Sequence, residues 1–224
     1  MKLKSGLIVS CQAAHGEPLY GLNIMRYFAK AAVAGGAVGI RALCEEIPEI
    51  KEEVNVPVIG LTKRVSAESS VYITPGFEDI DKLAKTGCDV IAMDLTMRKR
   101  PDNVTAEELI NYARANICGI ELMADTDCIE SAEEAEKLGF DYIGTTMRGY
   151  TEKTRGAVIP DFEFLKELSK IVKNAKWIAE GGIWEPEQLE KISDLKPYAV
   201  VIGTAITRPK DITERFAGIL KNNL

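Results

Sequence analysis

The stretch Val56-Pro57-Val58-Ile59-Gly60-Leu61-Thr62-Lys63-Arg64 is a short apolar run that ends in two cations. Residues 56–61 carry no charge, and the run is rich in β-branched side chains, which is typical of a strand buried on both faces. Lys63 stands where such a strand would leave the core. Burial disfavours the charged form of a lysine, so a lysine at this point can act as a base near neutral pH. The alternative is a surface lysine that caps the strand end.

The same pattern of a short apolar segment followed by a helix recurs along the chain. It predicts strands at residues 6–10, 37–40, 56–61, 89–93, 119–124, 141–144, 176–179 and 199–202. It predicts helices at residues 18–35, 45–54, 77–86, 105–115, 128–138, 161–172, 186–192 and 211–220. Strands that alternate with helices favour a parallel sheet. Eight such units in 224 residues predict one (β/α)8 TIM barrel domain over residues 1–224.

An open doubly wound α/β sheet is the alternative fold. It is less favoured because no Gly-x-Gly-x-x-Gly turn follows the first predicted strand. The 46% of hydrophobic residues is enough for a sizeable core in either fold.

Charge and hydropathy narrow the classes of partner. The net charge of −6 argues against nucleic acid or an anionic membrane as the main partner, although a local basic cluster could still bind a small anion. The chain has no run of eighteen apolar residues, and its first residues lack a signal-peptide core. We therefore expect a cytoplasmic protein with no membrane partner. Five scattered cysteines without a Cys-x-x-Cys pair indicate reduced thiols.

Metal and cofactor chemistry find little support in the sequence. The one histidine, His15, lies in Ala-Ala-His-Gly-Glu-Pro, which is typical of a loop. A site with several histidine ligands is thus excluded, and a Ser-His-Asp triad would depend on this one residue. We expect no metal and no cofactor.

The predicted strand ends carry most of the candidate site. In a (β/α)8 barrel the active site lies at the carboxyl ends of the strands. The residues that stand there are Gln12, Arg41, Lys63, Asp94, Asp125, Thr145, Thr146, Glu180, Gly203 and Thr204. Bringing the charged members of this set to one rim has a large desolvation cost unless they serve a charged ligand.

Glycines after the last two predicted strands suggest a phosphate site. Gly181, Gly182 and Gly203, with Thr204, would expose backbone N–H groups, and the amino end of a short helix there would bind phosphate. Arg208 adds a forked donor suited to phosphate oxygens. The alternative is that these glycines only form tight turns. With a phosphate clamp, a lysine and carboxylates, the set suits proton abstraction beside a carbonyl, as in isomerases and epimerases of sugar phosphates.

The sequence resembles the N-acetylmannosamine-6-phosphate 2-epimerase family over nearly its whole length. The segments that carry the resemblance are Gly6-Leu-Ile-Val-Ser-Cys-Gln12, Gly35-Gly-Ala-Val-Gly-Ile-Arg-Ala42, Pro57-Val-Ile-Gly-Leu-Thr-Lys-Arg64, Met123-Ala-Asp125, Gly139-Phe-Asp-Tyr-Ile-Gly-Thr-Thr146, Gly149-Tyr-Thr151, Ile178-Ala-Glu-Gly181 and Gly203-Thr-Ala-Ile-Thr-Arg-Pro209. The resemblance implies interconversion of N-acetylmannosamine 6-phosphate and N-acetylglucosamine 6-phosphate in sialic-acid catabolism.

The resemblance also implies roles for single residues. The catalytic lysine and glutamate fall on Lys63 and Glu180, the sugar-binding arginine and aspartate on Arg41 and Asp125, and the phosphate-site arginine on Arg208. Gln12, Thr145 and Thr146 are expected to bind the sugar as well. Two positions depart from the family pattern: Thr204 replaces a common glycine, and Gly182 stands where a larger residue is frequent.

Other functions remain open from the sequence alone. One is a different phosphate-binding barrel, such as a ribulose-phosphate epimerase-like or thiamine-phosphate synthase-like protein, although the former would need metal-ligating histidines. Another is a phosphosugar-binding regulator, which would keep Arg208 and the glycines but would not need Lys63 and Glu180. We expect a homodimer that acts on a phosphorylated amino sugar.

Overall fold

The computed structural model describes residues 2–13 and 15–221 and contains one closed barrel of eight parallel strands in chain order. The strands are β1 (Gly6–Cys11), β2 (Gly39–Leu43), β3 (Val58–Leu61), β4 (Val90–Asp94), β5 (Glu121–Asp125), β6 (Tyr142–Gly144), β7 (Lys176–Glu180) and β8 (Ala199–Ile202). The barrel closes where β1 pairs with β8. The predicted (β/α)8 fold is therefore confirmed.

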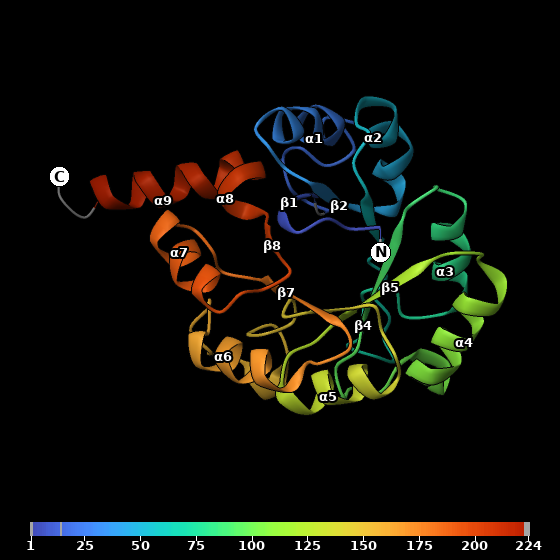
Figure 1. Cartoon of the computed structure of the whole chain (residues 1–224). Coiled ribbons are helices and arrows are strands. Elements are labelled where there is room, and N and C mark those ends of the chain that lie inside the picture. The colour runs from blue at the N-terminus through green and yellow to red at the C-terminus, as the bar shows by residue number, and fades with distance from the viewer. Residues whose placement is uncertain (1, 14, 222–224) are drawn as a thin grey trace.

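Helices surround the barrel on its outside (Figure 1). They are α1 (Met25–Ala34), α2 (Ile47–Glu53), α3 (Phe77–Ala84), α4 (Ala106–Asn116), α5 (Ile129–Lys137), α6 (Phe162–Ile171), α7 (Pro186–Asp194), α8 (Thr204–Thr207) and α9 (Pro209–Lys221). Three 3-10 turns, η1 (Cys44–Glu46), η2 (Pro101–Asn103) and η3 (Glu152–Thr154), lie in the connections. None of the helices in the described part of the chain is both long and apolar enough to span a membrane.

Side-chain alternation along each strand divides the core into two regions. On β3, Ile59 and Leu61 point into the barrel, whereas Val58 joins the layer between strands and helices. Gly60 lies on the outer face, where an added Cβ would come within 2.7 Å of Ile47 in α2. The apolar run at residues 56–61 thus contains a strand, Val58–Leu61, that is buried on both faces, with Gly60 at the point where a helix packs on its backbone.

The largest difference from the predicted helix boundaries lies at the first helix, and the structure adds a short helix near the end of the chain. The helix predicted from residue 18 begins only at Met25, because Gly21 and Asn23 have positive φ angles of 71° and 52° that no α-helix continues through. At the other end of the chain, the short helix α8 precedes α9.

Helix α9 projects away from the barrel (Figure 1). It contains no buried residue, and the large apolar side chains of Phe216 and Leu220 are 66% and 60% exposed. A helix of a closed barrel ordinarily buries an apolar stripe against the strands. The side chains of Phe216 and Leu220 therefore present an exposed apolar surface on α9.

Candidate active site

A cavity of about 590 Å³ opens at the carboxyl ends of the strands. Its walls come from the ends of β1, β2, β3, β7 and β8 and from the loop after β6. Among the predicted site residues, its lining includes Gln12, Arg41, Lys63, Thr146, Glu180, Gly181, Gly182, Gly203, Thr204 and Arg208. Side chains from separate parts of the chain therefore meet in one place, as the barrel topology predicts.

A buried ion pair forms one side of this cavity. Arg41 Nη1 donates to Asp125 Oδ1 at 3.0 Å, and Nη2 donates to Oδ2 at 2.6 Å. The side chains are only 1% and 0% exposed. Burial alone would lower the pKa of Arg41, but Asp125 and Glu180 outweigh burial, and the net shift of this pKa is upward. Arg41 is a permanent cation at the inner wall.

Glu180 ends β7 beside this pair. Its Oε2 lies 3.3 Å from Arg41 Nη1 and 3.0 Å from the hydroxyl of Thr146. Burial is the largest influence and raises the pKa of the Glu180 carboxyl; Arg41 opposes burial, and the negative charge of Asp125 reinforces it. The net shift is upward, so Glu180 holds a proton more readily than an ordinary glutamate.

Lys63 follows β3 and faces the cavity. Its backbone is fixed by an antiparallel bridge to Ile73. Its ammonium group makes no hydrogen bond or ion pair within the described residues. Surrounding protein lowers the pKa of Lys63, and the positive charges of Arg208 and Arg41 lower it further, against the opposing effect of Glu180. The sequence left open both a buried lysine and a surface lysine at the strand end. In the structure the side chain is exposed to the cavity, where protein walls and two cations desolvate and destabilise its charge.

The segments after β7 and β8 carry the predicted phosphate-binding residues, which line the cavity. Gly181 and Gly182 have positive φ angles of 113° and 71°. A Cβ on Gly182 would lie 2.5 Å from the backbone of Ile159, so this departure from the family pattern is required by the chain's own loop. Arg208 lines the same part and forms a 3.0 Å ion pair with Glu17.

Gln12 lies deeper on β1's side of the cavity. Its side-chain Nε2 donates to Ser10 Oγ at 2.9 Å, and both residues line the cavity. This bond fixes the amide so that its carbonyl oxygen can accept from a ligand.

Two residues predicted to bind substrate hold other site residues instead. Asp125 is fully buried, and its two oxygens are occupied by Arg41 and the Thr146 hydroxyl. The hydroxyl of Thr145 donates to the carbonyl oxygen of Glu180 at 2.8 Å and accepts from its N–H at 2.9 Å. Neither Asp125 nor Thr145 is among the residues that line the cavity. The sequence predicted which residues stand at the strand ends, but not the partners to which their side chains are hydrogen-bonded.

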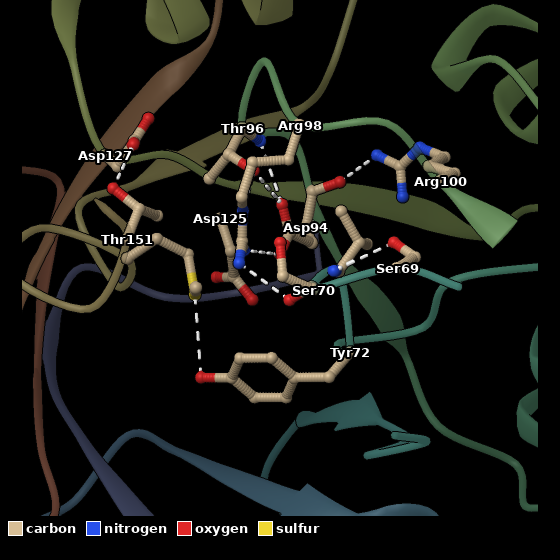
Figure 2. A network of polar contacts seen from close by, with 12 residues as sticks. Ser69, Ser70, Tyr72, Asp94, Thr96, Arg98, Arg100, Asp125, Asp127 and Thr151 are labelled. Carbon is tan, nitrogen blue, oxygen red and sulfur yellow. Dashed lines mark hydrogen bonds and ion pairs between the residues drawn. The ribbon is translucent and has the colours of Figure 1, made fainter. Parts of the chain in front are cut away.

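Asp94, the remaining charged strand end, belongs to a separate network (Figure 2). It accepts from Arg98 at 2.5 Å and from the Thr96 hydroxyl at 2.7 Å, and Arg98 also donates to the carbonyl oxygen of Ser70. This network ties the loop after β4 to the segment before Tyr72. Asp94 thus shapes the cavity wall without lining it.

Sequence reasoning missed several cavity-lining residues. Tyr72 reaches the cavity from the segment that bridges to Lys63, and its hydroxyl points to the sulfur of Met147 at 3.9 Å (Figure 2). Tyr150, Ile159 and Trp184 also contribute large apolar surfaces to the lining. The pairing of the Tyr72 segment with Lys63 could not be predicted, because no local sequence pattern records a bridge between two loops.

The described residues contain no group of three or more histidine, cysteine, aspartate or glutamate side chains placed to hold a metal ion. The polar side chains that line the cavity are one lysine, two arginines, the carboxylates of Glu180 and Asp211, hydroxyls and an amide. This set can move a proton and bind an anion.

Comparison with known proteins gives a consistent family. The family described as "Putative N-acetylmannosamine-6-phosphate epimerase" matches residues 25–222. A relative from Staphylococcus carnosus, named "Putative N-acetylmannosamine-6-phosphate 2-epimerase", is 51% identical over 98% of this chain and 99% of its own. One of the same name from Staphylococcus haemolyticus is 52% identical over 96% of both chains.

Solved structures agree with the sequence relatives. The N-acetylmannosamine-6-phosphate 2-epimerase from Clostridium perfringens superposes with a TM-score of 0.92 at 46% identity, over 97% of this chain and 94% of that chain. Because the family match covers residues 25–222 and the relatives span nearly the whole chain, the chain belongs to the N-acetylmannosamine-6-phosphate epimerase family.

Proposed function

We propose that this chain interconverts N-acetylmannosamine 6-phosphate and N-acetylglucosamine 6-phosphate by removing and returning the proton at carbon-2. Membership of the family supports the substrate. The observation that carries the chemistry is that one cavity holds Lys63, with a lowered pKa, and Glu180, with a raised pKa. Two groups whose environments move their pKa values in opposite directions suit an acid–base pair near neutral pH.

The proposed reaction passes through the open-chain sugar. In the ring form the hydrogen on carbon-2 is weakly acidic, whereas in the open-chain aldehyde it lies beside a carbonyl. Lys63 takes this proton, the C–H bond breaks, and its electron pair moves toward the carbonyl oxygen to give an enolate. Glu180 helps to return or relay a proton to the opposite face. Substrate and product are isomers, so the reaction balances without a redox cofactor, and we propose none.

The rest of the cavity would hold the substrate at both ends. Arg41 and Gln12 would bind the hydroxyl and amide groups of the sugar. Arg208 and the backbone N–H groups around Gly181, Gly182, Gly203 and Thr204 would bind the phosphate. Asp125 and Thr145 would act indirectly, through Arg41 and Glu180. Arg208 would exchange its ion pair with Glu17 for the phosphate.

The test of this function is direct. Proton NMR of N-acetylmannosamine 6-phosphate with the purified protein should show signals of N-acetylglucosamine 6-phosphate rising to equilibrium. Unphosphorylated N-acetylmannosamine, at a matched subsaturating concentration, should turn over poorly. Equal turnover of the two sugars would contradict the phosphate clamp, and no turnover of either would contradict the function.

We further propose that the protein is cytoplasmic and forms a homodimer. The dimer is supported by the exposed apolar side chains of α9, which another copy of the chain could bury. Replacing Phe216 and Leu220 with Glu should then convert the dimer to a monomer in light scattering or sedimentation. A wild-type monomer at micromolar concentration would contradict this proposal.

A further inference from the structure

Thr146 lies between the two carboxylates of the site. Its Oγ1 is 2.6 Å from Asp125 Oδ1 and 3.0 Å from Glu180 Oε2. A threonine hydroxyl has one proton to donate and two lone pairs with which to accept. It cannot donate to both carboxylates at once.

The shorter contact indicates where this proton goes. Asp125 is the partner of Arg41, whose two Nη atoms bind its two oxygens, and an ionised Asp125 is what this paired geometry stabilises. The 2.6 Å distance from Thr146 is that of a hydroxyl bound to a carboxylate. The Thr146 hydroxyl therefore donates its hydrogen bond to Asp125.

With the Thr146 proton directed to Asp125, the contact between Glu180 and Thr146 needs a proton from Glu180 to be a hydrogen bond. If Glu180 were ionised, lone pairs of Oε2 and of the threonine oxygen would face each other at 3.0 Å. If Glu180 carries a proton, Oε2–H donates to Thr146 and every contact is satisfied. Arg41 Nη1 lies 3.3 Å from Oε2, but its hydrogen bonds go to Asp125 and to the sulfur of Met123.

We propose that Thr146 is a positioning residue that holds Glu180 in its protonated form by accepting a hydrogen bond from it while donating to Asp125. When Glu180 gives up its proton, rotation of the Thr146 hydroxyl lets it donate to Glu180 instead, while Asp125 keeps both bonds from Arg41. The groups that face Glu180 are thus Arg41 from β2, Lys63 after β3, Asp125 from β5 and Thr146 after β6. The use of this proton in catalysis rests on the proposed function; the protonation of the free protein does not.

This role predicts the sign of a pKa change. In the protonated state Thr146 makes two hydrogen bonds, to Glu180 and to Asp125, but in the ionised state it donates only one. Thr146→Val removes two hydrogen bonds from the protonated state but only one from the ionised state. The pKa of Glu180 should therefore fall, by up to about one unit. If the hydroxyl of Thr146 instead donates to an ionised Glu180, the same substitution raises that pKa.

The experiment is an NMR titration of the substrate-free protein carrying ¹³Cδ-labelled glutamate. Glu180→Gln identifies the Glu180 signal. We expect a lower midpoint in Thr146→Val and a midpoint restored toward wild type in Thr146→Ser, which keeps the hydroxyl. The matched control is Thr126→Val, because Thr126 is a nearby buried threonine whose hydroxyl donates to the carbonyl oxygen of Gly144.

The outcomes separate the possibilities. A midpoint that rises or stays unchanged in Thr146→Val, with Thr126→Val unchanged, overturns the proposal. Should Thr146→Val fail to fold, Thr146→Ala is compared with Thr146→Ser. The Glu180 titration midpoint should then be lower in Thr146→Ala. Since no substrate is present, an inactive protein would contradict the epimerase function without altering this result.

Discussion

Asp125 accepts hydrogen bonds from both Nη atoms of Arg41, at 3.0 and 2.6 Å, and neither side chain is more than 1% exposed. Removing one member of a buried pair leaves the other charge without compensation. Asp125 also accepts a hydrogen bond from the hydroxyl of Thr146. One fully buried carboxylate thus fixes two residues that line the cavity.

Asp125→Asn should destabilise the protein by about 3–5 kcal/mol, because Arg41 would remain buried without its ionised partner. Urea denaturation of the variant and wild type measures this difference. The double variant Arg41→Met with Asp125→Leu should lose less stability than Asp125→Asn, although it should be inactive. A single variant as stable as wild type would show that the pair is not what holds Arg41.

Arg208→Ala should weaken binding of the phosphorylated sugar by about 1.5–3 kcal/mol, the value of a hydrogen bond to a charged group. Calorimetric titration with the phosphosugar measures this loss. Lys210→Ala is the matched control, since Lys210 pairs with Glu214 and does not line the cavity. Equal affinities for Arg208→Ala and Lys210→Ala would place the phosphate elsewhere.

Activity should survive exhaustive chelation. The described residues offer no group of three potential metal ligands, and the proposed proton transfer uses side chains alone. The measurement is turnover after dialysis against a strong chelator, with and without added divalent ions. Loss on chelation with recovery by one metal would require a carboxylate site that involves residues such as Asp94 and Asp125.

Much of the architecture could be predicted from sequence because each strand is marked by a short apolar run and each strand end by a change in chemistry. The site could be predicted only in part. At the end of β5 the sequence reveals a carboxylate but not that Arg41 occupies it, since that contact joins residues 84 positions apart. Tyr72 was missed for the same reason, because its position depends on a bridge between Lys63 and Ile73.

Glu46 gives the stability a pH dependence. Its side chain is half-buried after β2, and its Oε2 has no hydrogen-bond partner among the described residues. Burial, and then the charge of Glu45, raise the pKa of Glu46 from 4.5 to about 8. The folded state therefore binds this proton more tightly than the unfolded state. Its contribution to stability is full below the unfolded pKa and is lost as pH rises from about 4.5 to about 8.

Glu46→Gln should remove this part of the dependence. The free energy of unfolding of the variant should fall less than that of wild type over the same pH range, and the variant should be the more stable of the two at pH 8. The exposed Glu52→Gln is the control and should follow wild type. Parallel curves for wild type and Glu46→Gln would mean that Glu46 titrates normally.

Lys63 should be the group that removes the proton from carbon-2. The measurement is proton NMR of N-acetylmannosamine 6-phosphate in heavy water, which reports both epimerisation and entry of deuterium at carbon-2. Wild-type protein should introduce deuterium during turnover. Lys63→Ala, shown by circular dichroism and calorimetry to fold and to bind the phosphosugar, should abolish both epimerisation and exchange. A folded Lys63→Ala that still exchanges this hydrogen at the wild-type rate would contradict the assignment of Lys63 as the base.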